Sequence, residues 1–137
     1  MCIVQVFEKE QLMEFRIESS DEDFDTMLAM HAAKKYTWAL FIGHLVIEKL
    51  LKALFVKMKG EMPPFIHNLL RLAEKCDLNL NDDQKTFFAT VTAFNINTRY
   101  DDFKKEFSRM CTSEFTAGWV NEIKAYRQWI KALIKGS

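Results

Sequence analysis

The sequence predicts an all-α fold, an up-and-down helical bundle of about five helices that form a single domain over residues 1–137. Only four glycines and two prolines interrupt the chain, whereas an all-β fold needs turn residues about every 8–12 positions. Hydrophobic residues make up 49% of the sequence, which excludes a disordered chain. A length of 137 residues suits one domain that buries a core without disulfides or metals.

The N-terminal segment, residues 1–19, is ambiguous, because its mainly apolar run 3–7 can begin either a strand or a helix. Ser20 is followed by acidic residues 21–23. This pattern predicts a helix start at Ser20, since serine caps free backbone N–H groups and acids suit the positive end of the helix dipole. The first predicted helix runs from there to about Lys35.

A second helix is predicted from Tyr36 to about Met58, where Gly60 and the prolines at 63 and 64 stop it. Its apolar residues lie on every side at 100° per residue. A helix of this kind is buried by its neighbours or by a partner chain.

One polar stripe crosses this second helix, formed by His44, Glu48 and Lys52 at i, i+4 and i+8. Charges on a buried helix must pair or face a wet cleft, and a Glu four residues before a Lys is the favourable order. Three interpretations stay open: an ion ladder at the bundle surface, a ligand-binding groove, or a dimer seam.

The remaining elements follow from caps and breakers. The pattern predicts a short third helix over about 67–76, a fourth from a cap at Asn81 or Asp82 to about 97, a loop with a possible extra turn over 98–110, and a fifth helix from Thr112 or Ser113 to about 135, before Gly136.

The charge balance excludes a strongly basic nucleic-acid-binding domain, because 19 basic residues meet 19 acidic ones and the pI is near 6.8. The balance is uneven along the chain, however. Residues 1–30 hold eight acids and two bases, and residues 31–60 hold one acid and six bases. The acidic segment is expected to close on the basic helix, to pair across a dimer, or to form solvated faces.

Cysteine usage and the absence of a targeting or membrane-spanning pattern favour a cytoplasmic protein without membrane partners. Cys2, Cys76 and Cys111 are odd in number and form no CxxC pair, so neither a disulfide framework nor a zinc site is expected. The longest apolar stretch, residues 39–56, contains charged residues that are too costly to bury in lipid.

Several kinds of chemistry are excluded by the motifs that are missing. Four glycines form neither a GxGxxG motif nor a P-loop, and no serine lies in a GxSxG turn. His31, His44 and His67 never occur as HxxxH, so no metal site and no cofactor are expected.

Two segments carry candidate functional residues. His67 begins the third helix, where either its imidazole or Asn68 can cap. Arg99 and Tyr100 end the fourth helix, where a guanidinium can bind a phosphate and the ring can stack on a base. The alternative for Arg99 is an ion pair with the acids at 101 and 102.

Three motifs together resemble those of HEPN domains, in the same order and with similar spacing. Residues 44–53, HLVIEKLLKA, resemble the signature of the family's second helix. Residues 66–69, IHNL, after the proline pair, are similar to its THDL helix start, and residues 97–100, NTRY, are similar to its ARYP segment. The resemblance covers nearly the whole chain from about residue 20.

The resemblance implies a helical bundle that forms a homodimer and is often encoded beside an MNT-type nucleotidyltransferase, as in toxin–antitoxin modules. Many members of the wider superfamily are ribonucleases with an Arg-x4-6-His motif. The motif arginine would be Arg99, and its histidine would fall at Lys104, Lys105 or Glu106, none of which is His. Metal-free RNA cleavage needs a group that exchanges protons near neutral pH, the usual task of His.

The resemblance and the missing histidine together favour a non-catalytic or weakly catalytic HEPN protein that binds a nucleotide or an RNA phosphate. The candidate ligand-binding residues are His44, Glu48, Lys52, His67, Arg99 and Tyr100. The first alternative is a metal-independent endoribonuclease toxin, in which Arg99 and a histidine outside the motif, His67, are the catalytic candidates. The second alternative is a protein-interaction module whose polar stripe is only a dimer seam.

Overall fold

The computed structural model describes residues 2–136, with side chains from residue 8 onward. Six helices and no strand occur in this part of the chain, which confirms the predicted all-α class. They are α1 (Cys2–Ala32), α2 (Tyr36–Lys59), α3 (Leu69–Lys75), α4 (Asp82–Arg99), α5 (Asp101–Met110) and α6 (Ser113–Lys135).

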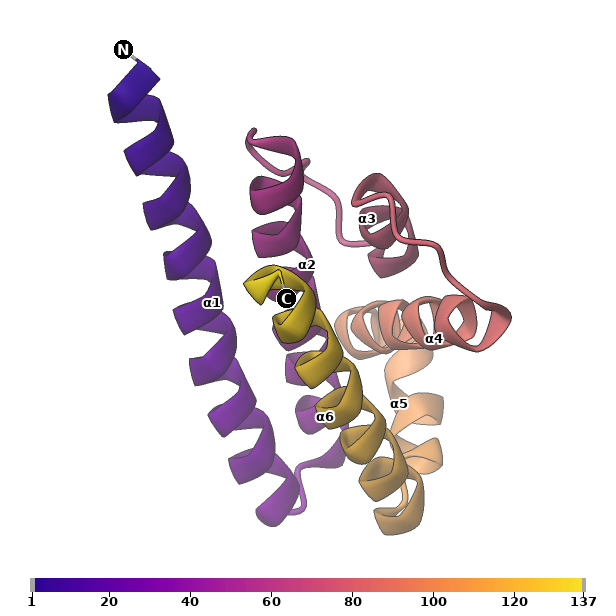
Figure 1. Cartoon of the computed structure of the whole chain (residues 1–137). Helices are drawn as coiled ribbons and strands as arrows, with labels where there is room; N and C mark the ends of the chain where they lie inside the picture. The colour runs from indigo at the N-terminus through magenta and orange to yellow at the C-terminus, as the bar shows by residue number, and fades with distance from the viewer. Residues whose placement is uncertain (1, 137) are drawn as a thin grey trace.

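Helix α2 is the centre of the molecule and contacts each of the other five helices. In Figure 1, α1 runs antiparallel to α2 on one side, and α6 runs alongside α2 in the same direction. Helix α4 lies across this set, with α3 above it and α5 below it in the same view. Most apolar residues of α2 are thus buried by the chain itself, whereas Trp38 near its start and Met58 near its end are exposed.

The predicted helix start at Ser20 is wrong, because α1 is one continuous helix that includes the segment whose structure was ambiguous. Ser20 lies in the middle of α1, fully buried, and its hydroxyl donates to the carbonyl oxygen of Val46 at 2.8 Å. A small side chain lets α1 approach α2 closely at this point. The apolar spacing Met13, Ile17, Phe24, Met27 continues through Ser20 and is the signal for an uninterrupted helix.

The predicted loop over 98–110 is also wrong, because residues 101–110 form α5. Tyr100 has an extended backbone, which ends α4, and α5 begins at once with two acids in its first turn. Phe103, Phe107 and Met110 recur at i, i+4 and i+7, a helical spacing that the many charges obscure.

The other helix ends follow the predicted signals. Asn81 and Gln84 form a capping box on α4, and the Thr112 side chain accepts from the N–H of Phe115 at the start of α6. Gly60 and Gly136 end α2 and α6 in the left-handed conformation, each at φ 67°.

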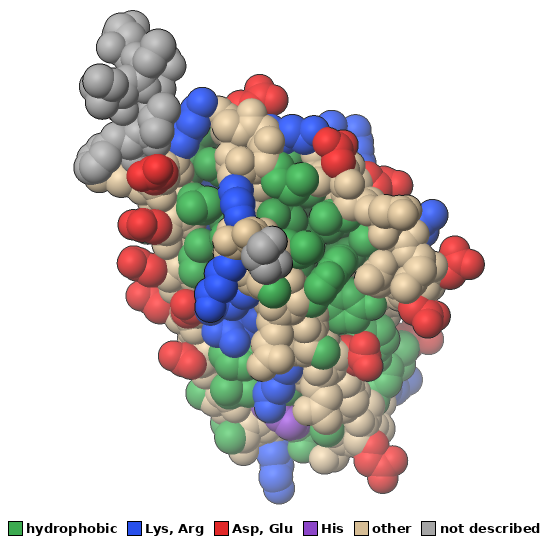
Figure 2. Space-filling view, viewed as in Figure 1, with side chains coloured by type: hydrophobic (Ala, Val, Ile, Leu, Met, Phe, Trp, Pro, Cys, Tyr) green, Lys and Arg blue, Asp and Glu red, His purple; other side chains and the backbone are tan. Residues whose placement is uncertain are grey.

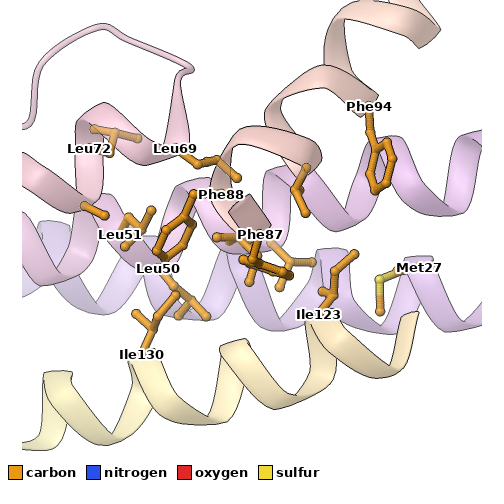
Figure 3. Packing of buried hydrophobic residues seen from close by; sticks show 14 of the residues in the cluster. Met27, Leu50, Leu51, Leu69, Leu72, Phe87, Phe88, Phe94, Ile123 and Ile130 are labelled. Atoms are coloured by element: carbon orange, nitrogen blue, oxygen red, sulfur yellow. The ribbon is translucent and has the colours of Figure 1, made fainter. Parts of the chain in front are cut away.

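The core lies between α2, α4 and α6, with contributions from α1 and α3 (Figure 3). Leu50 and Leu51 of α2 pack toward Phe88 of α4 and Ile130 of α6. Aromatic rings also fill the space between α4 and α6, where Phe87 stacks on Tyr126 with ring centroids 3.7 Å apart. Each fully buried Leu, Ile or Phe contributes about 1.5–3 kcal/mol.

Two acids of the acidic segment, residues 1–30, form ion pairs with other helices of the same chain, and the other acids are solvated. Asp21 pairs with Arg127 at 3.0 Å and with Lys131 at 2.9 Å, and Asp23 pairs with Lys49 at 2.6 Å. The other acids gather along the edge of the molecule over α1, which is red in Figure 2. They are Glu8, Glu10, Glu14, Glu18, Glu22 and Asp25, all exposed.

Among the described residues, no helix is both long and apolar enough to cross a lipid bilayer. Cys76 and Cys111 are buried free thiols, and burial raises their pKa values to about 12 and about 11. Cys2 lies outside the residues whose side chains are described.

Candidate anion-binding cleft

A small cleft of about 230 Å³ lies where the C-terminal half of α4 meets the loop that precedes α3. The loop contributes His67 and Asn68, and the end of α4 contributes Arg99 and Tyr100. Thr92, Asn95 and Ile96 complete the lining. The hydroxyl of Thr92 accepts from the backbone N–H of Leu69 at 3.0 Å, so it ties the start of α3 to α4 and fixes the width of the cleft.

Arg99 lies in the last turn of α4, because the chain turns into an extended conformation at Tyr100. Its guanidinium is 3.5 Å from Oδ1 of Asn95 and 5.9 Å from the ring of Tyr100. No carboxylate in the described part of the chain lies within ion-pair distance of Arg99, so the alternative pairing with Asp101 or Asp102 is not observed.

His67 is free to face the cleft because Asn68, not His67, caps α3. The side chain of Asn68 accepts from the N–H of Arg71 at 3.1 Å. Nδ1 of His67 lies 2.9 Å from Oε1 of Glu48, while 63% of the His67 side chain is exposed. With Nδ1–H donating to the carboxylate, Nε2 is the ring nitrogen left for a ligand or a proton.

Glu48 and Lys52 lie beneath the cleft, each only 7% exposed. Nζ of Lys52 is 3.2 Å from Oε2 of Glu48, so the predicted i, i+4 pair forms, but inside the molecule and not at the bundle surface. Glu48 thus joins the cleft imidazole of His67 to a buried ammonium. Lys52 contributes to the cleft only through Glu48.

His44 is fully buried and does not line the cleft. Its Nε2 is 2.9 Å from the backbone carbonyl oxygen of His67, and its Nδ1 is 3.1 Å from Nδ2 of Asn95. A carbonyl only accepts and an amide NH₂ only donates, so His44 carries its proton on Nε2 and is neutral.

Burial lowers the pKa of His44, and this effect outweighs the opposing hydrogen bond to the His67 carbonyl and the charge of Glu48. Oε1 of Glu48 lies 3.7 Å from Nδ1 of His44. We do not regard this contact as an ion pair, because Nδ1 already accepts from Asn95 and carries no proton.

Asn95 is the residue that sequence reasoning missed. It is 6% exposed and lies between His44 and Arg99, in contact with both. Its spacing of four residues from Arg99 on a predicted helix is the only signal in the sequence that could have indicated it.

Of the six predicted ligand-binding residues, His67, Arg99 and Tyr100 line the cleft together, with Tyr100 half-exposed at its rim. Glu48 touches His67 from below, and His44 and Lys52 are set behind the surface. Within the described residues, no cluster of His, Cys, Asp and Glu side chains could hold a metal ion.

A family model described as HEPN domain matches residues 13–133, which is most of the chain. The chain belongs to the HEPN domain family. Neither the curated proteins nor the solved structures include a significant match to it. Two motif segments line the cleft of this HEPN domain, since the loop before α3 supplies His67 and the end of α4 supplies Arg99. The third segment supports it from behind, because Glu48 of α2 lies 2.9 Å from Nδ1 of His67.

Proposed function

We propose that this HEPN domain binds the phosphate of a nucleotide or of RNA in the cleft, without cleaving it, and that Arg99 is the main phosphate ligand. The observation that carries the proposal is a guanidinium at the cleft with no carboxylate partner among the described residues. An arginine fork binds phosphate oxygens in pairs, and hydrogen bonds of this charged kind are about twice as strong as neutral ones.

The other polar groups of the cleft also favour an anion. The oxygen of Asn68 is engaged in the α3 cap, which leaves its NH₂ group for a ligand. Thr92 already uses its hydroxyl on Phe88 and Leu69. Because no carboxylate is part of the lining, the cleft offers mainly donors, as an oxyanion requires.

The size of the cleft argues for partial enclosure of the ligand. Sites that enclose whole small molecules measure about 300–1,000 Å³, whereas this cleft measures about 230 Å³. A phosphate and part of its sugar fit within that volume. The half-exposed ring of Tyr100 at the rim is available to stack on the base.

We propose a homodimer as the working unit and an MNT-type nucleotidyltransferase as its partner in a cytoplasmic, toxin–antitoxin-like module. Exposed apolar side chains beside the cleft support the homodimer, since Phe65 is 95% and Ile96 44% exposed. The buried free thiols of Cys76 and Cys111 suit a reducing compartment.

The test is binding of a short, labelled single-stranded RNA and of AMP to the purified protein, with Arg99→Ala and the matched control Arg109→Ala. Arg109 is exposed on α5 and does not line the cleft. We expect Arg99→Ala to weaken binding roughly 10- to 100-fold, the range for a charged hydrogen bond, and Arg109→Ala to have no effect. Equal losses in the two variants, or no binding by the wild-type protein, would overturn the proposal.

One observation favours a second candidate function, a metal-independent ribonuclease. The Glu48 carboxylate lies 2.9 Å from Nδ1 of His67, an arrangement that orients the ring and leaves Nε2 as the nitrogen that can take a proton. In this reaction Nε2 takes the proton of a ribose 2′-hydroxyl, the 2′-oxygen attacks phosphorus, and the P–O5′ bond breaks. The 5′-oxygen leaves with a proton that His67 returns, and a 2′,3′-cyclic phosphate forms.

Cleavage of labelled RNA in the presence of a chelator separates the two functions. A ribonuclease predicts cyclic-phosphate products that are lost in His67→Ala and reduced about 100-fold or more in Glu48→Gln, with His31→Ala unchanged. Binding without cleavage supports the first proposal. If the protein neither binds nor cleaves RNA, the protein-interaction module is the better account.

A further inference from the structure

A chain of hydrogen bonds, buried at its centre, connects the two groups that the proposed ligand would meet. It runs from the Arg99 guanidinium to Oδ1 of Asn95, from Nδ2 of Asn95 to Nδ1 of His44, and from Nε2 of His44 to the backbone carbonyl of His67. We propose that Asn95 is the positioning residue of this site, which orients Arg99 and, through His44, the loop that carries His67. This inference rests on the proposed anion-binding function of the cleft.

The direction of each hydrogen bond is fixed by which of its two groups can donate and which can accept. Arg99 has only donors, so it must face the oxygen of Asn95. The amide NH₂ then faces His44, whose Nδ1 must accept and whose Nε2–H must donate. The carbonyl oxygen of His67 completes the chain as an acceptor at 2.9 Å. All three donors point the same way, which lets each bond polarise the next.

The amide of Asn95 serves both neighbours, because its oxygen accepts from Arg99 and its NH₂ group donates to His44. A leucine of similar size offers neither donor nor acceptor, so it would leave Nδ1 of His44 buried without a partner. An aspartate offers only acceptors, so it would still bind Arg99 but would draw a proton onto Nδ1 of His44. The two substitutions therefore have opposite effects on the imidazole, which a purely space-filling role for Asn95 would not produce.

The chain of hydrogen bonds matters for binding because flexible side chains must be ordered before they hold a ligand. Arg99 has an exposed side chain at the end of a helix, and His67 lies in a loop. Their buried partners, Asn95 at 6% exposure and His44 at 0%, are held by helices α4 and α2. A site preorganised in this way loses less conformational entropy on binding.

Charged or titratable groups from α1, α2, α4 and the loop before α3 act on His44 or its partners. Glu48 and Lys52 belong to its own helix, His67 to the loop before α3, and Arg99 to α4 beyond Asn95. From α1, the charge of Arg16 acts on Glu48.

The first experiment is ¹⁵N NMR of the three imidazoles at neutral pH, which needs no ligand. We expect wild-type His44 to show the neutral form with its proton on Nε2, and Asn95→Asp to show the doubly protonated form. Asn97→Asp, the same change two residues further along α4, should leave His44 as in the wild type. A wild-type His44 protonated on Nδ1, or an unchanged His44 in Asn95→Asp, would overturn the inference.

The second experiment measures affinity for the short single-stranded RNA in a double-mutant cycle. Asn95→Leu should weaken binding about fivefold, as for a lost neutral hydrogen bond. Its effect should be clearly smaller when Arg99 is already alanine, because only its action on the His67 loop through His44 then remains. Asn95→Asp is unsuited to this cycle, because its carboxylate would lie beside Arg99 and oppose an anionic ligand. Additive losses would contradict the positioning role.

The two experiments separate the inference from the proposed function. If the wild-type protein binds neither RNA nor AMP, the proposed function fails. The NMR spectra of the imidazoles then still test the assigned chain of hydrogen bonds. If the wild type binds and the cycle is additive, the function stands and the role of Asn95 is refuted.

Discussion

At the scale of single residues, two histidines of this HEPN domain have opposite environments. His44 is fully buried between an amide and a carbonyl. The His67 side chain is 63% exposed, and its Nδ1 lies 2.9 Å from the carboxylate of Glu48. In the sequence both are histidines near apolar residues, and both were candidates for ligand contact. Only the contacts show that His44 supports the cleft from behind while His67 lines it.

The buried imidazole predicts a pH-dependent stability. Burial lowers the pKa of His44 below its ordinary value of 6.5, so below pH 6.5 the unfolded chain takes up a proton that the folded protein does not. The contribution of His44 to the free energy of unfolding should therefore have its full value above about pH 6.5. On acidification the free energy of unfolding should fall, by up to about 1.4 kcal/mol per pH unit. Urea unfolding of wild type and His44→Gln between pH 7 and 5 measures this slope.

The variant His44→Gln should lose most of this slope, whereas His31→Gln should keep it. Asp21 does not contribute to this slope, because it affects the free energy of unfolding only at a lower pH. Burial raises its pKa, but its bonds to Lys131 and Arg127 outweigh this and lower the pKa from 3.8. The stability that Asp21 contributes is thus lost only as the pH falls below about 4. Equal slopes in wild type and His44→Gln would show that His44 is not buried neutral.

At the scale of helices, ends are determined locally and lengths are not. Asn81, Asn68 and Thr112 cap as their types predict, because a capping side chain acts on N–H groups two or three residues away. Ser20 has the same local signal and lies inside a helix, because α2 covers it and its hydroxyl finds the Val46 carbonyl instead. Tertiary packing decides between the two outcomes.

A close approach of three helices at Gly43 predicts a destabilising substitution. A Cβ on Gly43 of α2 would lie 2.6 Å from Cδ1 of Ile123 on α6 and 3.2 Å from Sδ of Met27 on α1. Gly43→Ala should therefore lower the free energy of unfolding by about 1–3 kcal/mol, although alanine by itself favours a helix by up to about 1 kcal/mol. Denaturant unfolding checks the value.

Two further variants test the cause. Gly118 on α6 has no atom within 4 Å of its Cβ position, so Gly118→Ala should stabilise by up to about 1 kcal/mol. Ile123→Val removes the Cδ1 atom that Gly43→Ala would meet, and the double variant should recover part of the loss. A Gly43→Ala variant as stable as wild type would mean that α1, α2 and α6 are further apart.

At the scale of the whole molecule, one chain buries most of α2, while Trp38 and Met58 near the two ends of that helix are exposed. Phe65, at 95% exposure, lies in the loop that carries His67. The proposed homodimer would cover this part of the surface, which brings its interface close to the cleft.

If the homodimer uses this surface, Phe65→Ser should weaken it strongly. Burying a Phe contributes about 2 kcal/mol, and a two-fold interface uses it twice, so dissociation should rise roughly a thousandfold. Phe15→Ser is the matched control, since Phe15 is 66% exposed on α1. Light scattering across a concentration series measures both. A monomeric wild-type protein would refute the homodimer, and a dimer unaffected by Phe65→Ser would place the interface elsewhere.

The sequence by itself determined the helical class, most helix ends, the Glu48–Lys52 pair and three residues that line the cleft. These depend on local spacing, where neighbours four residues apart on a helix meet in any fold. Tertiary structure decided the rest. It made α1 continuous through Ser20, placed His44 behind the cleft, and brought Asn95 between His44 and Arg99. Contacts between residues 44, 67 and 95 arise only when α2, the loop and α4 pack, and no local pattern encodes that packing.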